Sequence, residues 1–167
     1  MPDIWSQVAV SLNGEIDSAL WKLRDSDIFK EMGSEIERAF AAYFVVMLRA
    51  GGVEHELART PHEGCGFFLL PQYEIEGYRV DFLMGHSGRD GTRGFDLRRC
   101  VVIECDGHDW HERTKEQAAR DKKRDRFLLR NVGSVIHFTG SEIYRDVSAC
   151  MGEAIAALGV TNGYAAK

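Results

Sequence analysis

The chain has 167 residues, of which 44% are hydrophobic and 28% charged, and its formal net charge is −5 at pH 7. This length and composition are typical of one soluble globular domain with its own core. No apolar run approaches the roughly 18 to 20 residues of a membrane-spanning helix, and the N-terminus lacks the pattern of a signal peptide. We therefore expect a cytoplasmic protein without membrane contact.

The first third of the chain is predicted to be helical. Apolar residues recur at helical spacing over 4–32, which indicates one or two helices. Ser34 and Glu37 then form an S-x-x-E capping box, and the apolar stripe that follows predicts a second helix. Gly51 and Gly52 end this helix.

A β-rich middle follows. The segments 67–75 and 78–84 are predicted to be two strands joined around Gly77, and 85–94 is a charged, glycine-rich loop. The string CVVIECDG at 100–107 shows no alternation, which is typical of a strand covered on both faces.

The last third is predicted to contain two helices separated by a strand. Residues 114–131 form a helix that Gly133 ends, 134–140 form a short strand, and 141–158 form a closing helix with Ser141 as its candidate cap.

The predicted order of elements places helices on both sides of a short mixed sheet, an α/β or α+β architecture. We expect an N-terminal helical extension over 1–32, a core over 33–158 and a frayed tail over 159–167.

The cysteine pattern argues against a metal ribbon. Cys65, Cys100, Cys105 and Cys150 include no C-x-x-C pair, which is the signature of zinc ribbons and of redox motifs. Cys105 lies within an apolar strand and is expected to be a small buried residue. This cysteine usage fits a reducing compartment.

The charge is unevenly distributed. Between Arg113 and Arg130 the chain carries eight Lys or Arg against three Asp or Glu, which leaves −10 on the rest. Lys122, Arg126 and Arg130 recur every four residues and form a candidate nucleic-acid-binding stripe. A solvated helix face with ion pairs explains the same pattern.

Two acids interrupt apolar strands. Asp81 lies among Val80, Phe82 and Leu83, and Glu104 follows Ile103. A buried carboxylate is costly unless a cation or hydrogen bonds compensate it. Two such acids on neighbouring strands could share a divalent ion such as Mg²⁺, which prefers oxygen ligands.

Three strings carry a family resemblance: YRVDFLM, VVIECDGHDWHE and RDRFLLRNVGSVIHFTGSEI. Together they resemble the PD-(D/E)XK, or restriction-endonuclease-like, nucleases, and within them the branch around the very-short-patch-repair endonucleases and their bacterial relatives. In that branch an Asp ends the second strand, and the third strand runs into an acidic D-G and an aromatic-His pair. The matching features are Asp81, Asp106-Gly107, Trp110-His111, Arg124-Asp125, Leu129 to Gly133, and Glu142.

The resemblance implies an α/β fold with a restriction-endonuclease-like αβββαβ core, in which helices flank a central mixed sheet. It implies an endonuclease that hydrolyses DNA phosphodiester bonds with Mg²⁺ or Mn²⁺, of the repair, restriction or mobile-element type. Asp81 would be the principal metal ligand and Glu104 the second acid. The backbone carbonyl of Cys105 would add a ligand, and His111 would transfer a proton or contact phosphate.

One position departs from the wider superfamily, which often has Lys two residues after the strand acid. Here that place is Asp106, which either binds metal or caps the turn before Gly107. Glu37 matches in outline the acid that these nucleases place on the first core helix, although a capping box also explains it.

The supporting residues have two interpretations each. Asp125 is expected to face inward, where it orients His111 or locks its helix through a salt bridge. Trp110 packs over a helix or wedges against a base. Arg89 and Arg93 are candidate nucleic-acid-binding residues in a loop that adjoins the metal side if Asp81 ends its strand and that could close over a nucleic-acid strand.

Two other functions fit the sequence. One is a catalytically silent nucleic-acid-binding module of the same fold, which Asp106 in the usual lysine position favours. The other is an RNA-processing nuclease. No separate DNA-reading motif is visible, so target recognition falls to the core, to the N-terminal helices, to a homodimer or to a partner protein.

Overall fold

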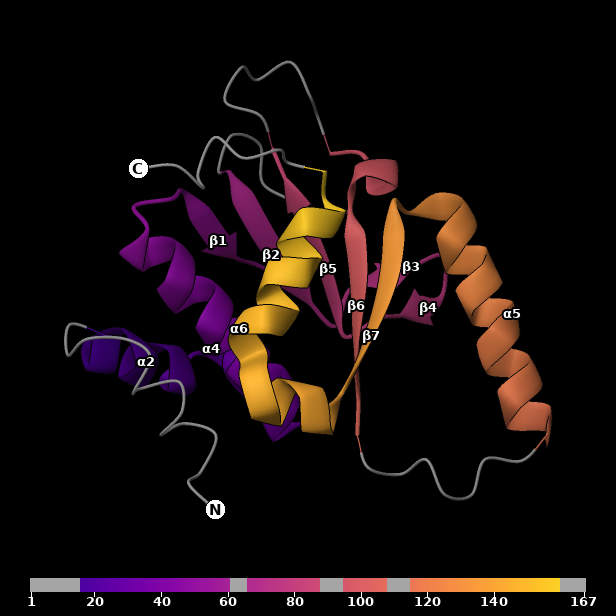
Figure 1. Cartoon of the computed structure of the whole chain (residues 1–167), viewed down its shortest axis with the longest axis horizontal. Coiled ribbons are helices and arrows are strands. Elements are labelled where there is room, and N and C mark those ends of the chain that lie inside the picture. Colours follow the sequence, from indigo (N-terminus) through magenta and orange to yellow (C-terminus); the bar gives the residue numbers. More distant parts are fainter. Residues whose placement is uncertain (1–15, 61–65, 88–94, 108–114, 160–167) are drawn as a thin grey trace.

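The computed structural model describes residues 16–60, 66–87, 95–107 and 115–159, and the expectations for 1–15 and for the tail after 159 lie outside these ranges. Helices flank a central sheet in a layered α/β arrangement (Figure 1). The elements are α2 (Ile16–Asp25), α3 (Asp27–Lys30), α4 (Glu35–Ala50), β1 (His55–Leu57), β2 (Phe67–Pro71), β3 (Glu74–Ile75), β4 (Tyr78–Arg79), β5 (Phe82–His86), a 3₁₀ turn (Leu97–Arg99), β6 (Val101–Asp106), α5 (Lys115–Asn131), β7 (Ser134–Thr139) and α6 (Gly140–Ala157).

Five strands form one mixed sheet in the order β1-β2-β5-β6-β7. The β2–β5 and β5–β6 pairs are antiparallel, whereas β1–β2 and β6–β7 are parallel. Strands β3 and β4 form a separate two-stranded hairpin. The sequence pattern does not predict β1, which has only three residues and no apolar alternation. The mixed α/β sheet flanked by helices confirms the expected fold class at this level.

Helices cover both faces of the sheet, with α4 and α6 on one side and α5 on the other (Figure 1). The larger core joins α4 and α6 to Phe82, Met84 and Ile103 of the sheet. The smaller core joins Leu128 and Val132, from α5 and its C-terminal end, to sheet residues on the opposite face, such as Val102.

Strand β6 lies between these two cores. Ile103 and Cys105 belong to the larger core, and Val102 to the smaller one. Because side chains alternate along a strand, Glu104 and Asp106 lie on the α5 face together with Val102. Burial on both faces explains why the strand begins with three apolar residues in a row.

The two long strands predicted over 67–75 and 78–84 are each divided. Pro71 ends β2, and Gln72 has a φ of 53°, in the left-handed region that breaks an extended strand. Asp81 lies between β4 and β5, where its carbonyl accepts a hydrogen bond of 2.8 Å from the Gln72 N–H. The prediction that Asp81 ends its strand is therefore wrong, because Asp81 precedes β5.

The helix caps are partly as predicted. Ser34 is the N-cap of α4, and its side chain accepts a hydrogen bond from the Glu37 N–H. The cap of α6 is Thr139 and not Ser141, because Thr139 and Glu142 form a reciprocal capping box.

The N-terminal helices share the main core. Leu20, Phe29 and Met32 are buried in the same cluster as the apolar face of α4. Within the described ranges, no helix is both long enough and apolar enough to cross a membrane.

The close packing of Gly85 between β2 and β5 predicts how a substitution there changes stability. Gly85 pairs with Phe68, and a Cβ at position 85 would come within 2.2 Å of the Phe68 ring. We expect Gly85→Ala to lower the free energy of unfolding by about 2 kcal/mol, the usual cost of overfilling a packed core. Urea denaturation followed by circular dichroism measures this change.

The matched control is Gly152→Ala in α6, where the added methyl group meets nothing within 4 Å. This substitution should raise stability by about 0.5–1 kcal/mol, since Ala favours a helix over Gly. Equal stability of Gly85→Ala and the parent would contradict the described pairing of β2 with β5.

Candidate active site

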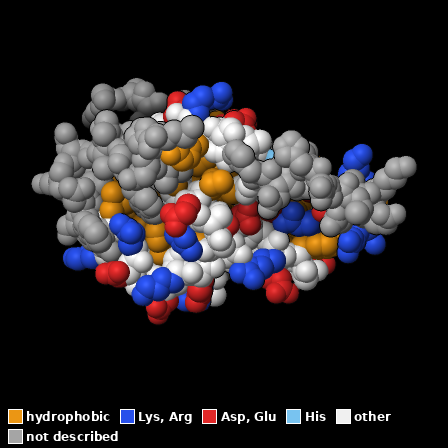
Figure 2. Space-filling model, turned by 90° about the horizontal axis from the view of Figure 1, so that it is seen from below, with side chains coloured by type: hydrophobic (Ala, Val, Ile, Leu, Met, Phe, Trp, Pro, Cys, Tyr) orange, Lys and Arg blue, Asp and Glu red, His pale blue; other side chains and the backbone are white. Residues whose placement is uncertain are grey.

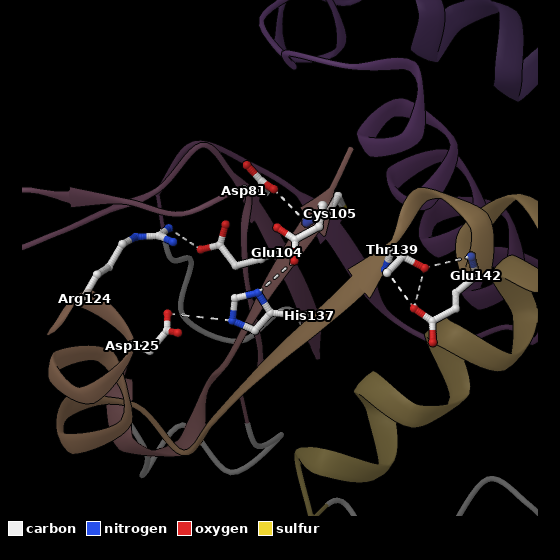
Figure 3. A network of polar contacts seen from close by, with 9 residues as sticks. Asp81, Glu104, Cys105, Arg124, Asp125, His137, Thr139 and Glu142 are labelled. Carbon is white, nitrogen blue, oxygen red and sulfur yellow. Dashed lines mark hydrogen bonds and ion pairs between the residues drawn. The ribbon is translucent and has the colours of Figure 1, made fainter. Parts of the chain in front are cut away.

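Asp81 is directed onto β6 by the pairing of β5 with β6. The last residue pair of this ladder joins Phe82 to Ile103, so Asp81 lies opposite Glu104 one residue further along. The Asp81 Oδ2 atom accepts a hydrogen bond of 2.7 Å from the backbone N–H of Cys105 (Figure 3). Two acids that are 23 positions apart in the sequence are thereby brought to one face of the sheet.

Glu104 is buried, with 6% of its surface exposed. Its carboxylate is paired with the guanidinium of Arg124 on α5 (Figure 3). The same Arg124 nitrogen donates a hydrogen bond of 2.8 Å to the carbonyl of Arg79. Arg124 therefore ties the buried acid both to the helix and to the small hairpin.

Glu37 is the second buried acid, with 6% exposure. Its carboxylate accepts hydrogen bonds from the Gln72 Nε2 (2.7 Å), the Gly33 N–H (3.0 Å) and the Ser34 hydroxyl (2.8 Å). The capping interpretation is thus correct in part. The bond from Gln72 also links Glu37 to the turn that leads to Asp81.

Asp106 ends β6 and lies beside a histidine of the neighbouring strand. The Asp106 Oδ2 atom is 3.3 Å from Nδ1 of His137, and the other ring nitrogen is 3.8 Å from Asp125 of α5 (Figure 3). Asp125 thus faces the sheet as expected. Its described histidine neighbour is His137.

The pKa values of Asp81 and Glu104 are both raised. Burial is the main cause that raises the pKa of Asp81, the Cys105 N–H acts against it, and the charge of Glu37 adds to it. Burial raises the pKa of Glu104 to about 7, although Arg124 opposes the shift, and the charge of Asp81 adds to it. Glu37, Asp81, Glu104 and Asp106 therefore form one electrostatically coupled group, which we call the acid cluster.

The acid cluster suits a hard cation in the kind of atoms that it offers. Carboxylate oxygens are the ligands that Mg²⁺ and Mn²⁺ prefer, and a cation beside Asp81 and Glu104 would oppose the rise in pKa that burial causes. Across the described residues, however, no three His, Cys, Asp or Glu side chains lie close enough together to hold a metal ion. Any ion there competes with Arg124 for Glu104.

The basic stripe lies on the exposed side of α5. Lys122, Arg126 and Arg130 are all exposed, whereas Arg124 and Asp125 between them are half-buried against the sheet. On the face of the molecule seen in Figure 2, Lys and Arg side chains alternate with Asp and Glu and do not gather into one patch.

Four of the predicted site residues lie outside the described residues: Arg89, Arg93, Trp110 and His111. The loop that contains Arg89 follows the end of β5, whereas Asp81 precedes the start of that strand. The loop was expected beside Asp81 only if Asp81 ended its strand, and Asp81 does not.

The sequence indicates Arg124 only as part of the family resemblance and gives it no role in the site. It does not predict His137 or Gln72 as site residues at all. Asp121, Arg124, Asp125 and Leu128 follow helical spacing, a signal that could have placed Arg124 on the inward face of α5. His137 carries a comparable signal, because it lies two residues after Val135 on a strand parallel to β6. The two side chains therefore share one face of the sheet. No sequence signal indicates Gln72.

Comparison of the chain with protein-family models, with curated proteins and with solved structures found no match.

The raised pKa of Glu104 predicts how stability depends on pH. Between its ordinary pKa of 4.5 and about 7, the folded chain holds a proton that the unfolded chain has lost. The free energy of unfolding should therefore fall as pH rises through this interval, by on the order of 2 kcal/mol from this group. The raised pKa of Asp81 acts in the same direction.

Glu104→Gln should flatten this slope, as measured by chemical denaturation at a series of pH values with chelator present. Glu142→Gln is the control of opposite sign, because hydrogen bonds from Thr139 lower the pKa of Glu142. The stability from Glu142 is lost as pH falls, so its removal should leave the decline above pH 4.5 in place. Parallel slopes for the parent and Glu104→Gln would refute the assigned role of Glu104.

Proposed function

We propose that this protein is a metal-dependent endonuclease of the restriction-endonuclease-like fold that hydrolyses phosphodiester bonds in DNA. The observation that carries the proposal is the acid cluster: Asp81 opposite Glu104 on one face of the sheet, with Asp106 beside them and Glu37 in electrostatic contact. Buried acids with raised pKa values, such as Asp81 and Glu104, cluster at functional sites. The sequence resemblance supports the same class.

Asp81, Glu104 and the carbonyl of Cys105 would hold Mg²⁺ or Mn²⁺. When bound, the ion supplies Lewis-acid activation of the phosphate and of an attacking water. Glu37, held by Gln72, adds negative charge that favours the cation. Asp106, at the end of β6, is oriented by His137 of the neighbouring strand β7.

Arg124 is the cation that the described site already contains. In the wider superfamily a Lys two residues after the strand acid supplies positive charge, and here that position is Asp106. Arg124 reaches Glu104 from α5. If Glu104 held a metal ion, the Arg124 guanidinium would be available for a phosphate oxygen. His111 or His137 would move the proton.

Cleavage of DNA tests the proposal directly. The parent should cut plasmid or oligonucleotide DNA in Mg²⁺ or Mn²⁺ and stop when chelator is added. Asp81→Asn should lose at least about 100-fold in rate, because it removes a charge from the acid cluster while keeping the size of the side chain. Glu153→Gln, at an exposed position in the C-terminal half of α6, is the control and should cut at the parent rate. Intact DNA in every form, or unimpaired cutting by Asp81→Asn, would refute the proposal.

A catalytically silent nucleic-acid-binding module is the second candidate, and one observation favours it. The Arg124 guanidinium forms an ion pair with Glu104, and such a pair can serve a purely structural role. Calorimetric titration with Mn²⁺ separates the two candidates. Heat of binding that Asp81→Asn abolishes supports the nuclease, whereas intact DNA affinity without metal uptake supports the silent module. Parallel digestion of matched DNA and RNA tests the remaining question of substrate.

The basic stripe of α5 predicts a salt-dependent contribution to binding. Replacing Lys122, Arg126 and Arg130 together with Gln should weaken DNA binding and reduce the slope of log affinity against log salt by about 2 to 3, one unit for each lost phosphate contact. Fluorescence anisotropy at a series of salt concentrations measures this slope. An unchanged slope would show that the stripe is a solvated helix face.

A further inference from the structure

A surface pocket lies beside the acid cluster. Its volume is about 320 Å³, and it is formed where α3, the hairpin and the ends of β1 and β2 approach one another. The residues that line it are Ile28, Glu31, Arg59, Pro71, Gln72 and Arg79. A volume of this size is at the small end of the range for small-molecule sites, which is enough for one nucleotide.

Two residues of the pocket wall also contact the acid cluster or its cation. Gln72 donates a hydrogen bond of 2.7 Å to Glu37 through its side chain. The Arg79 carbonyl accepts the hydrogen bond of 2.8 Å from Arg124, which in turn pairs with Glu104. The pocket and the acid cluster therefore share a wall, and a strand of nucleic acid could occupy both at once.

Of the two arginines that line the pocket, Arg79 has no ion pair among the described residues, although Glu74 is its partner across the β3–β4 ladder. Arg59 is paired with Glu31 through two hydrogen bonds, of 2.5 and 2.8 Å, so their charges cancel. The exposed side chain of Arg79 makes no hydrogen bond or ion pair with any part of the chain that the structure describes. Its guanidinium is therefore available to an anion, and phosphate is an anion that Arg binds well.

The rest of the pocket is suited to a sugar or a base. Ile28 and Pro71 are half-buried and supply apolar surface on its wall. A ligand that combines one phosphate with a flat, partly apolar ring matches this combination of a free guanidinium and an apolar wall.

We propose that this pocket holds the nucleotide next to the scissile phosphodiester, with its phosphate on Arg79 and its sugar or base against Ile28 and Pro71. The inference rests on the proposed nuclease function and adds to it a subsite for the flanking nucleotide. Arg79 acts here in binding, through its side chain, while its carbonyl keeps the contact with Arg124.

The test uses Arg79→Ala, which keeps the backbone carbonyl and therefore the bond from Arg124. We expect about a tenfold loss in kcat/KM on a short DNA substrate, carried by KM, because one charge-assisted hydrogen bond is lost. Arg49→Ala is the matched control. Arg49 is also an exposed arginine, but it lies in the last turn of α4, at the far end of that helix from Glu37. It should bind and cut as the parent does.

Substrates shortened by one nucleotide at either end complete the experiment. In the parent, removal of the nucleotide at one end should raise KM about tenfold, and in Arg79→Ala the same removal should change KM by less than about twofold, since the contact is already absent. Equal KM values for Arg79→Ala and a parent that cuts would overturn the subsite and leave the nuclease proposal standing. A parent that neither binds nor cuts DNA would overturn both.

Discussion

The pairing of β5 with β6 is the constraint on which the candidate site depends. It places Asp81 opposite Glu104 and allows a backbone N–H of β6 to hold the Asp81 carboxylate. Hydrophobic packing on both faces of β6 supplies the free energy that keeps these acids out of water. Burial raises the pKa values of both acids, and the charge of Arg124 lowers them in part.

The second constraint is the turn at Gln72. Because Gln72 adopts a left-handed conformation, the chain leaves the main sheet, forms the β3–β4 hairpin and returns at Asp81. The Gln72 side chain meets Glu37 of α4, and its N–H meets the carbonyl of Asp81. One residue thus links the first core helix, the hairpin and the start of β5, and the same residue lines the pocket beside Arg79.

The sequence predicts the parts of this arrangement that depend on local pattern. An acid within an apolar strand has to be compensated, which is why Asp81 and Glu104 could be singled out, and the helix over 34–50 follows from its capping residue and apolar stripe. The partners of those acids depend on tertiary packing. Arg124 and His137 reach the site only through the rotation of α5 and the parallel register of β7 with β6, which no local pattern specifies. The strand break at Gln72 was missed because glutamine rarely adopts a positive φ.

The alternation of β6 has a consequence for how the protein can change. Cys105 contributes its backbone N–H to Asp81 and its side chain to the packing beneath α4 and α6. Cys105→Ala would keep the amide that orients Asp81, since that amide is common to every residue except proline. At position 105 the group that orients the acid therefore belongs to the main chain, so selection can vary the packed side chain while this hydrogen bond is kept.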